Sequence, residues 1–158
     1  MEKQIKEVEI YTDGACTGNP GPGGYAAVLL YKGRQKEVCA GYKHTTNNRM
    51  ELLACIMGLR TLTEPCRVNL YSDSRYVVDG ITKGWAVRWR QNGWMRNKTD
   101  RALNDDMWGA LLDLTGKHDV SFIWVKGHND NEYNELCDKL ARGAIQSGPL
   151  LENDGGDL

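Results

Sequence analysis

Four acidic side chains, Asp13, Glu51, Asp73 and Asp138, are the residues of this sequence best suited to chemistry. Asp13 and Asp73 each follow a stretch typical of a β-strand, Glu51 follows a run of helix-capping residues, and Asp138 lies near the start of a candidate C-terminal helix. Strand ends are where α/β proteins place their active sites. Converging carboxylates repel one another unless cations neutralise them. The sequence therefore predicts a divalent-metal site, with Mg²⁺ or Mn²⁺ as its occupant.

Each of these motifs also has an ordinary structural explanation. Asp73 could be the N-cap of the next helix, and Glu51 could complement a helix dipole. The glycine-rich segment 18–24 lacks the G-K-[ST] signature of a nucleotide P-loop, so it could be only a turn. His128 could be a surface residue or, beside a metal, a proton shuttle. The motifs taken singly leave these alternatives open.

The elements that must position these side chains follow from the spacing of apolar residues. Alternation of polar and apolar residues predicts a strand at 7–11, and similar patterns predict strands at 25–31, 36–42, 67–72 and 120–125. Capping residues and helical periodicity predict helices over 50–59, 74–81, 103–114 and 134–145.

The order of these elements predicts one α/β domain built on a five-stranded mixed sheet flanked by helices. The first three strands are joined by short turns and form an antiparallel meander, and helical crossovers add two strands parallel to the first. In such a sheet Asp13 and Asp73 lie side by side. Glu51, from the crossover helix between them, can point at the same place.

The chain has 158 residues, enough for a single domain with a real core. It has no apolar run long enough to span a membrane, and its charged first residues do not form a signal peptide, so we expect a cytoplasmic protein. Its five cysteines include no C-x-x-C pair, which favours reduced thiols over a zinc site. We expect the domain to span 1–148 and the acidic, glycine-rich tail 149–158 to be disordered.

Positive charge is concentrated in one part of the sequence. Residues 75–101 contain seven basic and two acidic residues, a formal charge of +5, although the whole chain carries −1. A basic segment on an otherwise acidic protein indicates contact with a polyanion, unless it is only a solvated surface. The segment also contains Trp85, Trp89 and Trp94.

The motifs together, in this order, resemble the type 1 ribonuclease H family, particularly its bacterial single-domain enzymes. The resemblance covers about residues 7–144. The matching segments are 11–14 (YTDG), 18–25 (GNPGPGGY), 46–51 (TNNRME), 73–74 (DS), 124–128 (WVKGH) and 134–138 (NELCD).

The resemblance implies a ribonuclease H-like fold and an endoribonuclease that hydrolyses the RNA strand of RNA–DNA hybrids. It implies two Mg²⁺ ions, replaceable by Mn²⁺, and products with 5′-phosphate and 3′-hydroxyl ends. By this match Asp13 bridges both metals, Glu51 and Asp73 complete one site, and Asp138 completes the other. His128 matches a loop histidine that assists proton transfer or product release.

The resemblance also implies the contacts that select the substrate. The RNA strand would be contacted by the glycine-rich loop, Asn19, Asn48 and Glu51, and the DNA strand by Thr46, Asn47 and Asn104. Thr46 and Asn104 would form a phosphate pocket. Further nucleic-acid contacts fall on Arg75, where bacterial members often have glutamine, and on Trp85, Arg88 and Arg90 in a basic protrusion at about 83–101. Trp89 and Trp94 are predicted to pack the protrusion onto the body.

Two other functions are compatible with such a fold. One is a non-catalytic module that binds RNA–DNA hybrids, against which the presence of all four carboxylates argues. The other is a nuclease for DNA alone, such as a resolvase or integrase core, against which segment 47–51 and the glycine-rich loop argue. The leading hypothesis is a monomeric enzyme whose partner is the hybrid, with no membrane and no obligate protein partner.

Overall fold

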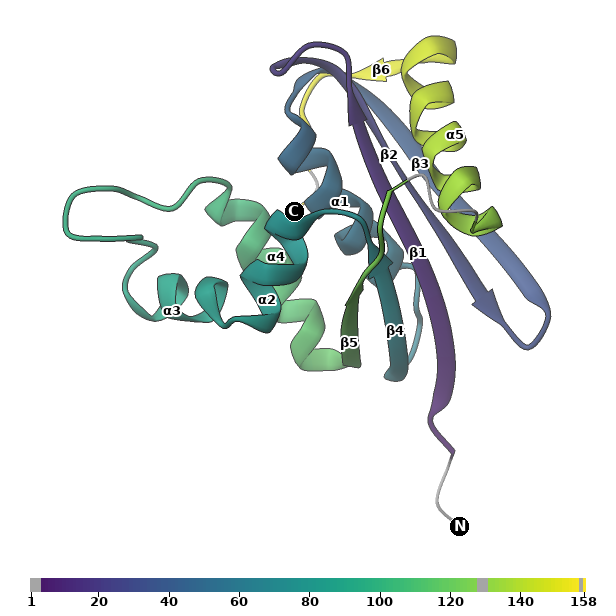
Figure 1. Ribbon diagram of the computed structural model, residues 1–158, viewed down its shortest axis with the longest axis horizontal. Coiled ribbons are helices and arrows are strands. Elements are labelled where there is room, and N and C mark those ends of the chain that lie inside the picture. Colours follow the sequence, from purple (N-terminus) through teal and green to yellow (C-terminus); the bar gives the residue numbers. More distant parts are fainter. Residues whose placement is uncertain (1–3, 128–130, 157) are drawn as a thin grey trace.

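A computed structural model describes residues 4–127, 131–156 and 158 of the chain. It contains one six-stranded mixed sheet with the strand order β5-β4-β1-β2-β3-β6, flanked by helices (Figure 1). The strands are β1 (Lys6–Cys16), β2 (Gly21–Tyr31), β3 (Arg34–Thr45), β4 (Cys66–Ser72), β5 (Asp119–Trp124) and β6 (Leu150–Leu151). The helices are α1 (Asn47–Arg60), α2 (Arg75–Thr82), α3 (Trp85–Gln91), α4 (Asp105–Lys117) and α5 (Glu132–Ser147).

The sheet has the predicted topology with one additional strand. β1, β2 and β3 are antiparallel neighbours, and β4 and β5 run parallel to β1. The predicted count of five strands is wrong, because β6 pairs in parallel with β3 at Gly41 and Tyr42. β6 is two residues long and follows Gly148-Pro149, so it leaves no alternating pattern in the sequence.

Helices cover both faces of the sheet, and β2 is buried between them. Ala27 and Leu29 of β2 belong to the large core beneath α1 and α4, whereas Ala26 and Val28 pack against α5. Successive residues of a strand point to opposite faces, so each layer receives every second side chain. Figure 1 shows α5 on one side of the sheet and α1, α2 and α4 on the other.

Glycine allows α5 to lie unusually close to the sheet. A Cβ atom built on Gly24 of β2 would lie 2.4 Å from the carbonyl oxygen of Ala141, and one on Gly41 of β3 would lie 2.6 Å from that of Ala144. Real Cβ contacts are never this short, so any other residue would displace the helix. This backbone contact sets the height of α5 above the sheet.

The first two strands are longer than predicted. β1 continues to Cys16 and β2 begins at Gly21, so the glycine-rich segment is mainly strand rather than loop. Pairing with β2 extends to Cys16 opposite Gly23, whereas pairing with β4 stops at Tyr11 opposite Tyr71. Asp13 therefore lies inside β1, beyond the point where β4 ends.

Two further expectations are wrong. Leu103, predicted to be the first residue of a helix over 103–114, lies before α4 and is 74% exposed. The tail after residue 148, predicted to be disordered, forms β6 and then binds the body through Asp154, whose carboxylate accepts hydrogen bonds from Arg49 and Thr45. An acidic, glycine-rich composition does not reveal that one of its acids binds the partly buried Arg49.

The described residues include no helix that is long and apolar enough to cross a membrane. All five cysteines are free thiols, and three of them, Cys55, Cys66 and Cys137, are buried.

Candidate active site

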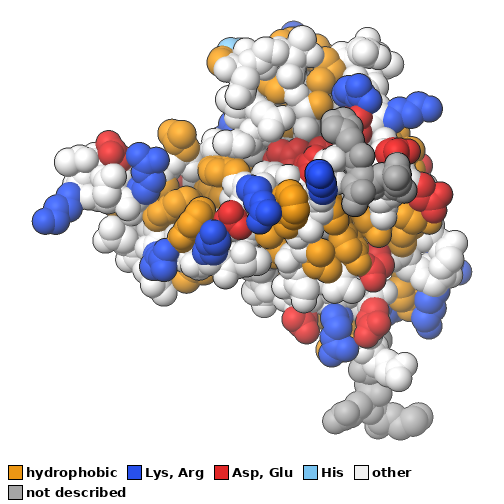
Figure 2. All heavy atoms as spheres, in the orientation of Figure 1, with side chains coloured by type: hydrophobic (Ala, Val, Ile, Leu, Met, Phe, Trp, Pro, Cys, Tyr) orange, Lys and Arg blue, Asp and Glu red, His pale blue; other side chains and the backbone are white. Residues whose placement is uncertain are grey.

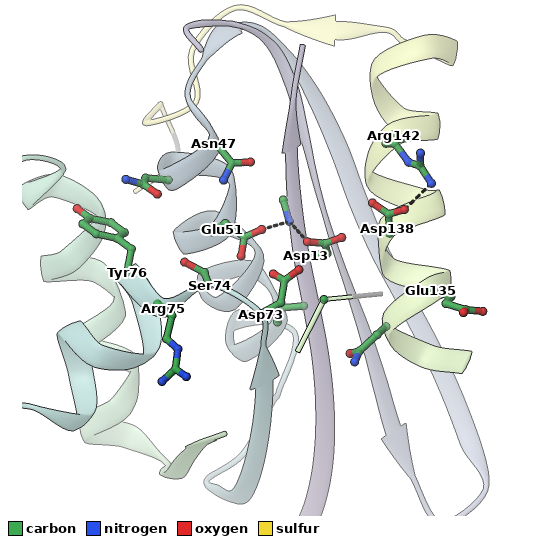
Figure 3. Close-up of a pocket in the computed structure, with 15 residues that line it drawn as sticks. Asp13, Asn47, Glu51, Asp73, Ser74, Arg75, Tyr76, Glu135, Asp138 and Arg142 are labelled. Carbon is green, nitrogen blue, oxygen red and sulfur yellow. Dashed lines mark hydrogen bonds and ion pairs between the residues drawn. The ribbon is translucent and has the colours of Figure 1, made fainter. Parts of the chain in front are cut away.

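The structure brings Asp13, Glu51 and Asp73 together at the end of β4 (Figure 3). Asp13 and Asp73 each lie two residues beyond Tyr11 and Tyr71, the last parallel pair of β1 and β4. They therefore project from neighbouring segments at the same height along the strands. Glu51 comes from the second turn of α1. One carboxylate oxygen from each of the three residues lies within 4.8 Å of the others.

Gly14 determines how closely α1 approaches β1. Its N–H donates to Oδ1 of Asp13 at 2.9 Å and to Oε1 of Glu51 at 2.7 Å. A Cβ atom on residue 14 would lie 2.5 Å from the backbone nitrogen of Glu51, so only glycine permits this approach. One backbone donor therefore holds two carboxylates in fixed orientations.

The electrostatics of the cluster favour a bound cation. Burial, the neighbouring charge of Asp73 and, to a smaller extent, that of Asp138 raise the pKa of Asp13 to about 7. Burial and the charges of Asp13 and Asp73 raise the pKa of Glu51 well above its usual range. A divalent cation would neutralise this repulsion, and a donor set made only of carboxylate oxygens suits Mg²⁺.

Asp138 faces the cluster from α5 across a cavity of about 670 Å³. Its Oδ2 accepts a hydrogen bond from Arg142, one helical turn further on (Figure 3). It lies outside the compact group of three acids found among the described residues, but it is close enough to affect the pKa of Asp13. The fourth predicted carboxylate thus lines the same cavity without touching the other three.

His128 lies outside the described residues. The last described residue before it, Gly127, lines the cavity beside Asp73: a Cβ atom there would lie 3.2 Å from Oδ2 of Asp73.

The residues predicted to bind nucleic acid differ in whether they line the acidic cavity. Asn47, Asn48 and Arg75 line the acidic cavity itself. Asn19 lies at its edge, where its Oδ1 accepts a hydrogen bond from the N–H of Asn47 at 3.0 Å. The remaining ones lie outside the cavity lining: Thr46, Trp85, Arg88, Arg90 and Asn104.

The basic protrusion is built on α3 and the segment that follows it. Figure 2 shows Lys and Arg side chains spread over this arm of the molecule. Arg88 is exposed, and Arg90 donates to Asp113 at 2.7 Å. Trp89 packs edge-on against buried Trp108, and Trp94 is also partly buried against the core, which confirms the predicted packing role of these two tryptophans.

Several cavity residues were not singled out by the sequence. Tyr76 and Arg142 are examples, although Arg142 stands four residues after Asp138 and could have been found from helical spacing. Arg75 stacks its guanidinium 3.7 Å from the ring centroid of Trp124, and the indole N–H of Trp124 donates to the carbonyl oxygen of Asp73. Nothing in the sequence pattern indicates that stack.

Comparisons with known proteins agree with this geometry. A family model described as RNase H matches residues 5–146. The chain is 63% identical over 146 residues to a ribonuclease H of Desulforamulus reducens, covering 92% of each chain. It is 59% identical over 155 residues to a ribonuclease H of Trichodesmium erythraeum, covering 98% of this chain and 99% of the relative. Among solved structures, LC9-RNase H1, described as a type 1 RNase H with the type 2 active-site motif, has a TM-score of 0.83 at 31% identity, covering 94% of this chain and 76% of the other.

Proposed function

Because the chain belongs to the ribonuclease H family, we propose that its acidic cavity hydrolyses the RNA strand of RNA–DNA hybrids, leaving 5′-phosphate and 3′-hydroxyl ends. The observation that carries this proposal is the meeting of Asp13, Glu51 and Asp73, whose oxygens lie within 4.8 Å of one another. The same fold occurs in LC11-RNase H1, solved in complex with an RNA/DNA hybrid, with a TM-score of 0.67 at 24% identity.

The four carboxylates fit two divalent cations, Mg²⁺ or its substitute Mn²⁺. Asp13, Glu51 and Asp73 would hold them together with Asp138. When bound, such cations activate the attacking water and neutralise charge on the phosphate and on the leaving 3′-oxygen. The chain itself orients the ligands: the N–H of Gly14 fixes two of them, and Arg142 holds Asp138.

Selection of the RNA strand is proposed to lie in the side-chain amides at the cavity. The amide of Asn48 supplies both donors and an acceptor, as a reader of 2′-hydroxyl groups requires, and Asn47 beside it is proposed to contact the DNA strand. Asn19 steadies this edge through its bond to Asn47. His128 is proposed to assist proton transfer.

The DNA strand is proposed to run over Thr46 and Asn104 towards the protrusion. There Trp85 and Arg88 can contact deoxyribose and phosphate. These contacts are sequence-independent and position the hybrid over the acids.

The substrate class can be tested with one set of reactions. End-labelled RNA–DNA hybrid, duplex RNA and duplex DNA are each incubated with the chain in Mg²⁺ and in EDTA. We expect cleavage of the RNA strand of the hybrid in Mg²⁺ only. Cleavage of duplex DNA at a comparable rate would instead support a DNA nuclease, and binding of the hybrid without any cleavage would support a non-catalytic module.

A further inference from the structure

Asn104 has a backbone conformation that its side chain does not explain. It precedes α4 at the N-cap position with φ 61° and ψ 32°, the left-handed region that non-glycine residues rarely adopt. Asparagine at an N-cap usually accepts a hydrogen bond from the first turn of the helix, but this side chain makes no such bond. Its amide forms hydrogen bonds with residues outside α4 instead.

Both ends of the Asn104 amide are held by other residues. Oδ1 accepts from Nη1 of Arg49 at 3.2 Å, and Nδ2 donates to the Tyr76 hydroxyl oxygen at 3.1 Å. That oxygen also accepts from the indole N–H of Trp108, which can only donate. The amide therefore has one defined orientation, with its carbonyl towards Arg49. An NH₂ group has two N–H bonds, so one remains for a ligand such as a phosphate.

Arg49 is itself fixed by two acids from distant parts of the chain. Asp106 of α4 accepts from Nη1 at 3.0 Å and from Nη2 at 2.8 Å. Asp154 of the C-terminal tail accepts from Nε at 2.8 Å and from Nη2 at 3.1 Å. With the bond to Asn104, these contacts match the five N–H bonds of a guanidinium group. The Asp154 side chain is only 13% exposed, so this is not a loose surface pair.

The tail reaches Arg49 by a defined route. β6 pairs with the edge of β3, Glu152 pairs with Lys43, and Asp154 then accepts a hydrogen bond from the hydroxyl of Thr45 at 2.5 Å. Figure 1 shows that the tail leaves α5 and ends on the other side of the sheet, among the helices. Gly155 continues beside Asp106 and Arg49.

We propose that Asp154 is a positioning residue for nucleic-acid binding, so that the C-terminal tail completes the pocket for one DNA phosphate. This inference rests on the proposed function. Without Asp154, Arg49 loses two of its five acceptors and turns towards Asp106. The Asn104 amide is then free to rotate and to present its carbonyl oxygen, which repels a phosphate, in place of its N–H.

A phosphate scan tests this role separately from stability. In a series of hybrids, one DNA phosphate at a time is replaced by an uncharged methylphosphonate, and binding is measured by fluorescence anisotropy in an Asp13→Asn background. We expect one position where the replacement weakens binding about tenfold, a loss of about 1.4 kcal/mol, close to the lower end of what a hydrogen bond to a charged group contributes. Asn104→Ala should remove that penalty.

Asp154→Asn should reduce the penalty to about twofold or less, because the amide of Asn104 is no longer oriented. Glu152→Gln is the matched control: it neutralises an acid of the same tail whose partner is exposed Lys43, and should keep the tenfold penalty. Thr45→Val, which removes the hydroxyl bonded to Asp154, should give an intermediate value and serves if Asp154→Asn folds poorly.

Retention of the full penalty in Asp154→Asn, or an equal loss of affinity for every hybrid, would reduce the tail to a structural role and overturn the inference. A flat scan in the Asp13→Asn background would overturn it as well. Cleavage by the unsubstituted chain in Mg²⁺ is measured in parallel. Its absence would refute the proposed function, whereas the binding scan would still decide the role of Asp154.

Discussion

At the scale of single residues, deprotonation of the acidic cluster lowers the free energy of unfolding of the metal-free chain. The pKa of Asp13 is raised from 3.8 to about 7 by burial and by Asp73. Between these two pH values the folded chain binds more protons than the unfolded chain, so the free energy of unfolding falls as pH rises through this window. Above pH 7 the whole penalty is present, and a cation that binds the carboxylates offsets it.

Asp13→Asn should therefore stabilise the metal-free chain above pH 7. We expect asparagine to relieve about 2 kcal/mol of this penalty and so to raise the melting temperature by about 4–8 °C at pH 8, since each kcal/mol corresponds to roughly 2–4 °C for a chain of this size. The fall in stability between pH 4 and pH 7 should also become shallower, and Mg²⁺ should raise the melting temperature of the parent chain more than that of the variant.

Thermal unfolding followed by circular dichroism across this pH range measures the effect. Asp119→Asn, at the exposed start of β5, is the control and should leave the pH dependence unchanged. A destabilised Asp13→Asn with the parental pH dependence would contradict the electrostatic account.

The sequence could predict most of this cluster, but not all of it. The convergence of Asp13, Glu51 and Asp73 follows from strand order, because two parallel strands and their crossover helix share one edge. The residue pattern singles out Asp138 as a fourth acid, but only the family resemblance places it beside the other three. Its approach depends on how closely α5 lies to the sheet, which residue spacing within the helix does not determine.

At the scale of elements, the contact between α5 and β2 is the feature that carries Asp138 to the cavity. Gly24 provides the closest approach, at the carbonyl oxygen of Ala141, one turn after Asp138. A change at residue 24 therefore reaches the site through the helix, although Gly24 does not line the cavity.

Gly24→Ala should lower both stability and activity. The added methyl group meets backbone rather than a flexible side chain, and overpacking of this kind typically costs about 1–3 kcal/mol. Displacement of α5 moves Asp138 away from the other acids, so we expect kcat/KM on the hybrid to fall about tenfold, a loss of about 1.4 kcal/mol in transition-state stabilisation.

Gly143→Ala is the matched control on the same helix. A Cβ atom there meets nothing within 4 Å, so alanine should stabilise the chain by about 0.5–1 kcal/mol and leave kcat/KM unchanged. Equal kcat/KM values for Gly24→Ala and the parent chain, measured where both are folded, would show that the height of α5 does not matter for catalysis.

At the scale of the whole molecule, charge is distributed so that acids line the cavity and cations lie on the protrusion. Many of these cations are already paired within the chain: Arg90 with Asp113, Arg96 with Asp100, Arg101 with Asp105 and Lys83 with Asp79. Within the described ranges, Arg88 makes no ion pair. A cation that must leave an internal partner contributes less to the binding of a phosphate.

The salt dependence of hybrid binding should therefore be shallow and should depend on Arg88 more than on Arg90. Arg88→Ala should reduce the slope of log K against log salt by up to about 0.9, the value for one phosphate contact. Arg90→Ala should reduce it less, because Arg90 loses its bond to Asp113 on binding.

Anisotropy titrations of the two variants at several salt concentrations would compare these slopes. Equal reductions would show that the ion pair with Asp113 does not lower the contribution of Arg90 to phosphate binding.

The tail is the part of the molecule that its own sequence describes least well. A glycine-rich, acidic composition is typical of disorder, and β6 is too short to show a period. What orders the tail is a set of long-range contacts: β6 pairs with β3, Glu152 pairs with Lys43, and Asp154 accepts from Arg49, 105 positions earlier in the chain. Local pattern cannot encode such a contact, whereas the regular elements of the sheet and helices, whose patterns are local, could be predicted.

The central claim is that metal-binding carboxylates carry out cleavage of the RNA strand while other residues hold the hybrid. The most direct test is to measure cleavage and binding of one labelled hybrid by the parent chain and by Asp13→Asn in Mg²⁺. We predict that Asp13→Asn lowers the cleavage rate by about a thousandfold or more, whereas its affinity for the hybrid changes by less than about threefold. Cleavage by Asp13→Asn at the parental rate would contradict the account.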